Sequence, residues 1–233
     1  MVQYLPENHR FRSCEGEVAM ITFRRYYIDS LLKEYSSLIK GVVLDIGGKR
    51  KNRRGNFSPE SCACKTWKYL NIDKASKPDY LASADSIPAD PETFDTVIMC
   101  ETIEHLENPD KALGEALRVM KRNGVLIITV PFLFPFHPDP VDYQRWTAQK
   151  INSELSRIGF GSISIKPMGG MFSVIFDLVH VFTVRNPKQR SFLNRALINL
   201  KKPVARIFML FEKMFPWTVE FMTTGYFVIA YKG

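Results

Sequence analysis

The sequence of 233 residues predicts an α/β fold built on a doubly wound, mostly parallel sheet. Two stretches carry this prediction. The first is VVLDIGG at residues 42–48 followed by YLNID at 69–73, two apolar runs that each reach an acid, with a glycine turn after the first. The second is the segment 94–131, which has the pattern of a strand, a helix and a strand, and therefore of one βαβ unit with a right-handed crossover.

The first of these stretches has the features of a buried strand and a ligand-binding turn. Its apolar residues 42–44 form a short run that suits a strand buried on both faces. Gly47 and Gly48 allow a sharp turn and let a ligand approach the backbone closely. Asp73 falls where an acid can accept hydrogen bonds from ribose hydroxyls. The pattern therefore predicts a nucleoside-bearing cofactor at the strand ends.

The second stretch contains start and stop signals for its helix. An apolar strand is expected over 94–99, and Asn108 can cap a helix that has Pro109 at its first position. Apolar residues then repeat at helical spacing, and Gly124 is the expected stop after two basic residues. Residues 125–130 are expected to form the next buried strand, closed by a proline.

With two further blocks, PFHPDPVDYQRWT at 135–147 and INSELSRIGF at 151–160, these motifs resemble those of the class I S-adenosylmethionine-dependent methyltransferases. The resemblance is to the methyltransferase type 11 branch, and to its members found with bacterial polysaccharide and lipopolysaccharide biosynthesis. It covers about residues 40–168 and a last strand near 225–231. It implies a Rossmann-like sheet of seven strands and S-adenosyl-L-methionine as the cofactor, and the length of the chain favours a single domain over 1–233.

The resemblance also implies which residues bind the cofactor: Asp45, Gly47, Gly48, Asp73, Ser83, Asp85, Cys100 and Glu101. Ser83 occupies the position where the family often has an Asp near the adenine, and Asp85 lies two residues later, so both are candidates. The glycine loop departs from the family pattern, because Lys49 and Lys51 stand at the later glycine positions. The shape of the loop around the methionine part of the cofactor is therefore left open.

An oxygen nucleophile loses a proton during methyl transfer, so a general base is expected on the acceptor side. His137 is the first candidate, because its loop follows a strand end, and Asp142 and Arg145 are its neighbours in sequence. His105, in the Glu104–His105 pair after the fourth strand, is the second. Each can instead be structural: a histidine can orient the loop, and Arg145 can pair with Asp142 to pin it.

The remaining elements are expected at the following positions: a helix over 16–38, a short helix over 59–65, strands over 68–72 and 79–82, a helix over 147–158 that ends at Gly159, and two antiparallel strands over 162–166 and 225–231. About 55 residues separate the last two strands, more than a plain loop needs. A helical insertion is therefore expected before the last strand.

This insertion, residues 171–217, carries most of the net charge. Residues 171–184 are strongly apolar but too few to span a bilayer. From Arg185 to Lys213 there are eight Lys or Arg residues and one acid, Glu212, against a net charge of +8 for the whole chain. Pro203 is expected to break or kink this basic segment into two helices. The segment suits an anionic membrane surface, and it equally suits a helical lid that packs on the sheet with its charges in solvent.

Composition limits the other possibilities. The first residues lack the apolar core of a secretory signal, and the four cysteines lack zinc-site spacing, so reduced thiols and no metal site are expected. The expected location is cytoplasmic, either free or peripheral at the inner face of the membrane. A basic run over 49–54 suits a solvated loop or a contact with a substrate phosphate. A nucleic-acid partner is not expected, because no RNA-binding module accompanies the run. The sequence gives no signal for an oligomeric state.

The expected function is that of a methyltransferase (EC 2.1.1.-) that uses S-adenosylmethionine to O-methylate a saccharide or a lipid-linked saccharide. One alternative is a methyltransferase for another small molecule or RNA. Another is a non-catalytic relative that binds a partner, which Lys49 and Lys51 in the glycine loop keep open. A nicotinamide-dependent oxidoreductase is disfavoured, because no G-x-G-x-x-G follows the first strand.

Overall fold

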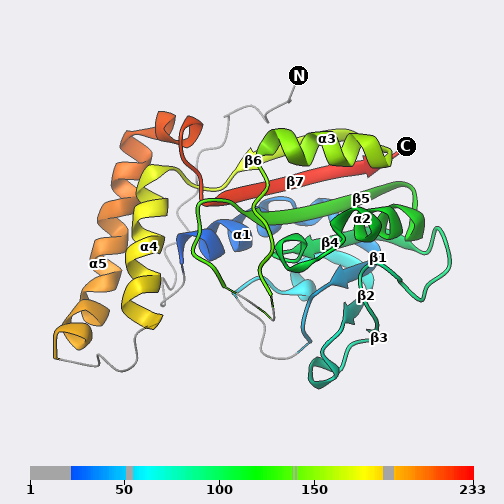
Figure 1. The fold of residues 1–233 in the computed structure, drawn as a ribbon, viewed down its shortest axis with the longest axis horizontal. Coiled ribbons are helices and arrows are strands. Elements are labelled where there is room, and N and C mark those ends of the chain that lie inside the picture. Colours follow the sequence, from blue (N-terminus) through cyan, green and yellow to red (C-terminus); the bar gives the residue numbers. More distant parts are fainter. Residues whose placement is uncertain (1–21, 51–54, 138, 140, 186–191) are drawn as a thin grey trace.

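The protein forms one seven-stranded sheet flanked by helices (Figure 1). The computed structural model describes residues 22–50, 55–137, 139, 141–185 and 192–233. The strand order is β3-β2-β1-β4-β5-β7-β6, and only β7 runs antiparallel to its neighbours. The strands are β1 (Lys40–Ile46), β2 (Ala63–Asn71), β3 (Tyr80–Leu81), β4 (Phe94–Cys100), β5 (Met120–Pro131), β6 (Phe160–Pro167) and β7 (Gly225–Lys232). The predicted fold class is confirmed.

The order of the strands places a crevice at the centre of the sheet. β1 pairs in parallel with β2 on one side and with β4 on the other. The chain runs outward from β1 to β3 and then returns to β4, so the connections diverge between β1 and β4. In sheets of this kind ligands bind outside the carboxyl ends of the strands at such a switch point.

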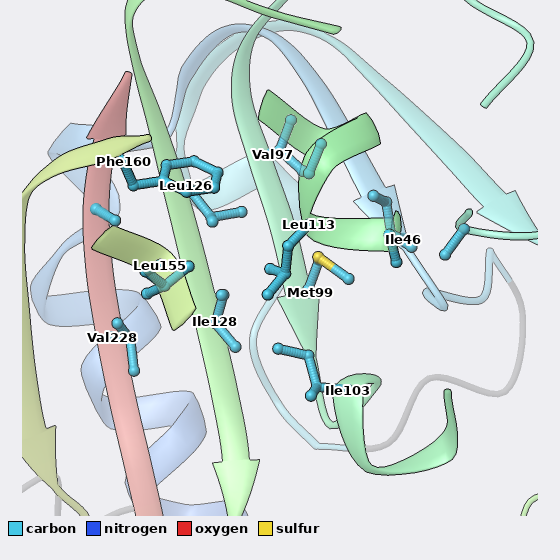
Figure 2. Packing of buried hydrophobic residues seen from close by; sticks show 14 of the residues in the cluster. Ile46, Val97, Met99, Ile103, Leu113, Leu126, Ile128, Leu155, Phe160 and Val228 are labelled. Carbon is cyan, nitrogen blue, oxygen red and sulfur yellow. The ribbon is translucent and has the colours of Figure 1, made fainter. Parts of the chain in front are cut away.

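Helices cover both faces of the sheet. They are α1 (Phe23–Glu34), α2 (Pro109–Val119), α3 (Ala148–Ile158), α4 (Met171–Arg185) and α5 (Phe192–Met214). α2 and α3 pack on one face, where Leu113 and Leu155 meet the strand residues Val97, Met99 and Ile128 (Figure 2). α1 packs on the other face, together with Phe176 of α4 and Ala205 of α5. Fully burying a large apolar side chain contributes about 1.5–3 kcal/mol, so these two clusters hold the layers together.

The ends of α3 follow from its sequence. The side chain of Thr147 accepts a hydrogen bond from the Lys150 N–H at 3.2 Å, and Gly159 has the left-handed backbone with φ +113° that ends the helix. The predicted helix over 147–158 with its stop at Gly159 is therefore confirmed. The predicted helix over 16–38 is confirmed over Phe23–Glu34, but it ends four residues early, since Ser36–Leu38 form a separate 3-10 turn. Residues 16–21 lie outside the described part of the chain.

Three further predictions about helices are wrong. Residues 59–65 form only a short 3-10 turn over Pro59–Ser61, because the chain from Ala63 onward already pairs with β1. α2 ends at Val119 and not near Gly124, because Met120 starts β5 by pairing with Phe94. α5 runs through Pro203 as one helix. Pro203 is exposed, so water can replace the hydrogen bond that its ring removes.

The insertion between β6 and β7 is a pair of adjacent helices, α4 and α5, that extends beyond the sheet (Figure 1). A carboxylate of α5 caps α4, because Glu212 accepts hydrogen bonds from the N–H groups of Gly170 and Ser173, the latter at 2.9 Å. Phe172 of α4 stacks on Phe211 of α5 with ring centroids 5.4 Å apart. These contacts fix the two helices against each other.

Candidate active site

The turn after β1 needs glycine at two positions. Gly47 has a φ of +82°, and a Cβ there would lie 2.6 Å from the hydroxyl of Thr102. A Cβ on Gly48 would lie 2.2 Å from the carboxylate of Asp45. The side chain of Asn71, at the end of β2, donates to the Gly47 carbonyl at 3.0 Å and fixes the turn. The glycines of this turn therefore pack against Thr102 and Asp45, and Gly47 is exposed at the sheet edge.

Acids from the neighbouring strands reach the same edge. Asp73 is exposed two residues after β2, and its carboxylate accepts a hydrogen bond from the Ala75 N–H at 2.8 Å. Ser83 and Asp85 are exposed just after β3. Because β1, β2 and β3 are parallel and adjacent, their carboxyl ends meet at one edge. The fold thus brings the cofactor candidates of these three strands to one side of the crevice.

Beyond β4, the side chain of Glu101 turns toward β5 and α1. Its backbone has a φ of +54°, an unusual conformation for a residue other than glycine. Its carboxylate accepts from the Thr129 hydroxyl at 3.0 Å and pairs with Arg24 Nη2 at 2.5 Å. Cys100 precedes it, and burial raises the pKa of that thiol, so the thiol is neutral. Glu101 therefore lies on the side of the crevice away from β2 and β3.

Glu104 and two histidines form a cluster beside this pair. The side chain of Glu104 is 1% exposed, and burial raises the pKa of its carboxyl. Its Oε1 lies 3.4 Å from His137 Nε2 and 3.8 Å from His105 Nε2. The two imidazole rings stand edge to face with centroids 5.3 Å apart. The two predicted candidates for the general base are thus neighbours around one buried carboxyl.

Backbone carbonyls select the tautomer of both imidazoles. His105 Nδ1 lies 2.5 Å from the Val141 carbonyl, and His137 Nδ1 lies 3.1 Å from the Pro135 carbonyl. A carbonyl oxygen only accepts hydrogen bonds, so each Nδ1 carries the proton in this assignment. In a neutral ring with this tautomer, the Nε2 atom that faces Glu104 is a lone-pair nitrogen, able to accept a proton or bind a cation.

The loop that carries His137 is pinned by an ion pair. Arg145 binds both carboxylate oxygens of Asp142, and Asp142 also accepts a hydrogen bond from the His137 N–H at 3.0 Å. The hydrogen bonds from Arg145 lower the pKa of the Asp142 carboxyl to about 2. The structure shows Arg145 paired with Asp142, which is the structural role that the sequence left open beside a catalytic one.

Arg24 of α1 belongs to the site although it is not among the site residues predicted from the sequence. It is 6% exposed, and its guanidinium carbon lies 3.7 Å from the centre of the Phe134 ring. Its Nη2 contacts Glu101 and lies 3.5 Å from His137 Nε2, while its Nη1 is buried with no hydrogen-bond partner among the described residues. Arg24 lies on the same face of α1 as the buried residues Ile28 and Leu31. A charged residue on the apolar face of a helix was the sequence feature that could have indicated its role.

The two described residues of the basic run over 49–54, Lys49 and Arg50, each form an ion pair with an acid. Arg50 pairs with Asp79 at 2.6 Å, and Lys68 joins the same carboxylate at 3.2 Å. Lys49 lies 3.9 Å from Asp139, on the loop after His137. Residues 51–54 lie outside the described part of the chain. The Lys49 contact links the glycine turn to the His137 loop across the crevice.

Comparisons with known proteins agree with this fold. Residues 58–128 match a family model described as a methyltransferase domain. A methyltransferase of Archaeoglobus fulgidus that depends on S-adenosylmethionine superposes with a TM-score of 0.52 at 18% identity, covering 89% of this chain and 94% of that one. The chain has the class I methyltransferase fold. A search of the curated proteins finds no match.

Two further structures show how widely this methyltransferase fold is used. The [4+2]-cyclase SpnF superposes with a TM-score of 0.56 at 15% identity, covering 90% of this chain and 81% of that one. Phosphoethanolamine N-methyltransferase 2 of Haemonchus contortus, in complex with S-adenosyl-L-methionine, gives 0.52 at 16% identity, and the match covers 89% of this chain but only 52% of that one. At these identities the likeness shows a shared fold.

Proposed function

We propose that this protein uses S-adenosylmethionine to methylate a hydroxyl group of a saccharide or a lipid-linked saccharide. The observation that carries the proposal is the placement of two different sites at one edge of the sheet. The glycine turn and Asp73 lie at the carboxyl ends of β1 and β2, and the Glu104 cluster lies beyond the carboxyl end of β4. A cofactor on the first site would lie next to an acceptor on the second.

The first site fits S-adenosylmethionine. Gly47 and Gly48 pack so closely against Thr102 and Asp45 that any Cβ would collide with them, while Gly47 itself is exposed and its backbone can be approached by a ligand. Asp73 offers a carboxylate to ribose hydroxyls, and Ser83 and Asp85 are the candidates for the adenine edge. When bound, the cofactor supplies a methyl group on a positively charged sulfur. The protein contributes position and the exclusion of water.

The second site fits a hydroxyl acceptor. The acceptor O–H bond breaks, an O–C bond forms, and the electron pair of the broken carbon–sulfur bond stays on sulfur, so one proton must leave. The lone-pair nitrogen of His137 beside Glu104 can assist this loss. The buried donor of Arg24, Nη1, is available for an acceptor oxygen.

The insertion favours an acceptor at a membrane surface. Exposed apolar side chains recur at helical spacing along α4, at Ile175, Leu178, Val179 and Phe182, and along α5, at Ile207, Leu210, Phe211 and Met214. An exposed pair, Trp217 and Phe221, follows α5. Among the described residues, no helix is long and apolar enough to cross a bilayer. Exposed apolar stripes beside a strongly basic segment suit a helix pair lying on anionic lipid, and a lipid-linked saccharide is the matching acceptor.

The proposal is tested by binding and transfer. Isothermal titration with S-adenosylmethionine should show saturable binding, and titration with NAD should show none. Transfer of a labelled methyl group should then be measured to polyprenyl-linked saccharides, to free monosaccharides and to RNA. Label in an ether-linked methyl group of a saccharide supports the proposal. Binding without transfer to any saccharide, or transfer to RNA alone, overturns the acceptor class, and failure to bind S-adenosylmethionine overturns the function itself.

A further inference from the structure

The buried charges around the acceptor site do not balance. Arg145 neutralises Asp142, and Arg24 neutralises Glu101, each at hydrogen-bonding distance. Glu104 is the third carboxyl group of the cluster, and both of its oxygens are buried without a hydrogen-bond partner among the described residues. An uncompensated carboxylate in a buried position is costly, so a proton or a further cation must accompany Glu104.

The imidazole nitrogens that face Glu104 are acceptors when the rings are neutral. The Nε2 atoms of His105 and His137 are turned toward its Oε1, because the Nδ1 atoms are held by the carbonyls of Val141 and Pro135. One donor atom from each of the three residues lies within 4.8 Å of the other two. Lone pairs that face one another across so short a distance repel unless positive charge lies between them.

We propose that Glu104, His105 and His137 bind a divalent first-row transition metal ion. Two neutral imidazole nitrogens and one carboxylate oxygen are a preferred donor set of such ions, whereas Mg²⁺ and Ca²⁺ prefer oxygen alone. A metal-binding histidine commonly donates its second ring N–H to a backbone carbonyl, which is the arrangement of both imidazoles here. Cysteine spacing predicted no metal site, and these donors are of another kind and come from two separate loops.

The distances suit this role. Ligands that lie about 2.0–2.2 Å from one ion are about 3–3.5 Å apart. The separation of 3.4 Å between Glu104 and His137 already falls in this range, and the 3.8 Å separation of His105 needs an adjustment of a few tenths of an ångström. Arg24 Nη2 lies 3.5 Å from His137 Nε2, and the ion would replace this long contact while the guanidinium keeps its pair with Glu101.

Three protein ligands leave coordination positions for oxygen atoms of the acceptor. This part of the inference rests on the proposed function. An acceptor hydroxyl bound to the ion would have a lowered pKa, so its proton would leave to water as the methyl group is transferred to the oxygen. The Nε2 lone pair of His137 would then bind the ion, and the ion would take over the activation of the hydroxyl.

The experiment measures metal binding directly on the full chain without a histidine tag. Protein stripped with EDTA is titrated with Zn²⁺, with Co²⁺ and, for comparison, with Mg²⁺. We expect one tightly bound Zn²⁺ or Co²⁺ per chain and much weaker Mg²⁺ binding, with the visible absorption of Co²⁺ reporting nitrogen and oxygen ligands. Glu104→Gln and His137→Gln should each weaken Zn²⁺ binding by at least about 10–100-fold. This is the loss seen when a residue that only hydrogen-bonds to a metal ligand is replaced.

Matched control variants distinguish Zn²⁺ binding at this site from Zn²⁺ binding elsewhere on the protein. Glu107→Gln changes an exposed acid three residues from Glu104, and His180→Gln changes a histidine of α4, so both should bind Zn²⁺ like the wild type. Circular dichroism and the affinity for S-adenosylhomocysteine establish that each variant is folded. Zn²⁺ affinity that is equal in wild type and Glu104→Gln overturns the metal site, and so does the absence of a one-to-one complex; a shared proton then balances the charge. Loss of cofactor binding with metal binding retained would overturn only the proposed function.

Discussion

The carboxylate of Asp177 in α4 accepts a hydrogen bond from the backbone N–H of Arg24 in α1 at 2.9 Å. The same carboxylate accepts from the Phe23 N–H at 2.6 Å, so the insertion caps the amino end of α1. The side chain of Arg24 in turn reaches Glu101 and His137 at the site. The position of a buried group in the site therefore depends on a contact 153 residues away in the chain.

The first prediction concerns this contact. Burial raises the pKa of the Asp177 carboxyl to about 7, although the two N–H groups and the Arg24 charge oppose the shift. A raised pKa means that the native state binds this proton more tightly than the unfolded chain. The stabilisation of the native state by this proton is therefore fully present below about pH 4 and is lost as pH rises through about 7. Asp177 should lower the free energy of unfolding by up to about 4 kcal/mol across this window.

Urea unfolding between pH 4 and pH 8 checks this prediction on wild type and Asp177→Asn. The variant cannot titrate, so its free energy of unfolding should fall less steeply between pH 4 and 7. Asp110→Asn serves as the control, because Asp110 is exposed and pairs only at the surface with Arg157. Identical pH slopes for wild type and Asp177→Asn would show that Asp177 does not titrate in this range.

The second prediction concerns the cofactor. Asp73→Ala should weaken the binding of S-adenosylmethionine by about 1–3 kcal/mol, as expected for the loss of a hydrogen bond to a charged group. Titration calorimetry measures the affinity, and Asp79→Ala is the comparison, since Asp79 is held by Arg50 and Lys68. An unchanged affinity in folded Asp73→Ala protein would remove Asp73 from the cofactor site.

The sequence predicted the strands well because their signals are local. Apolar runs, Gly159 and Pro131 mark ends that depend only on neighbouring residues. β2 was predicted too short, because the half of it that begins at Ala63 is largely exposed and carries little apolar signal. Pairing with β1, a tertiary interaction, decides its start.

The same distinction holds at the site. His105 and His137 were found because their types are reactive and they follow strand ends. Arg24 was missed because its role depends on contacts with Glu101 and Asp177 that no sequence spacing encodes. The burial of Glu104 was also invisible, since acids on short turns are usually exposed.

The third prediction tests the ion pair between Arg24 and Glu101. Arg24→Met leaves a buried carboxylate without its partner, which should lower the free energy of unfolding by about 3–5 kcal/mol. The double variant Arg24→Met with Glu101→Gln removes both charges and should recover part of this loss. Urea unfolding of the four proteins gives the interaction energy. Strictly additive effects of the two changes would mean that the pair is not coupled.

The fourth prediction separates the two sides of the crevice. His137→Ala should lower turnover strongly and leave the affinity for S-adenosylmethionine nearly unchanged, because His137 lies in the Glu104 cluster and not at the glycine turn. Methyl transfer and titration calorimetry are measured on the same preparation. His180→Ala is the control histidine. Wild-type turnover in folded His137→Ala protein would exclude His137 from catalysis.

The last prediction concerns the helix pair α4 and α5. If their exposed stripes lie on anionic lipid, Phe182→Ser with Leu210→Ser should reduce binding by removing apolar contact with the acyl chains. Arg206→Glu with Lys213→Glu should weaken it at least about tenfold, because each basic residue near such a surface contributes about 1 kcal/mol. Binding should also fade with added salt, since exposed charges are screened over about 8–10 Å at physiological ionic strength.

Vesicle co-sedimentation with and without anionic lipid measures both effects. The controls are matched in kind and lie elsewhere: Phe136→Ser is an exposed aromatic outside the insertion, and Lys74→Glu with Lys111→Glu reverses two exposed charges. We expect these controls to bind like the wild type, and all variants to keep their affinity for the cofactor. Equal and negligible binding of the wild type to both kinds of vesicle at low salt would leave the insertion as a packed lid. The insertion would then have a structural role, through the hydrogen bonds of Asp177 with α1 and of Glu212 with the start of α4.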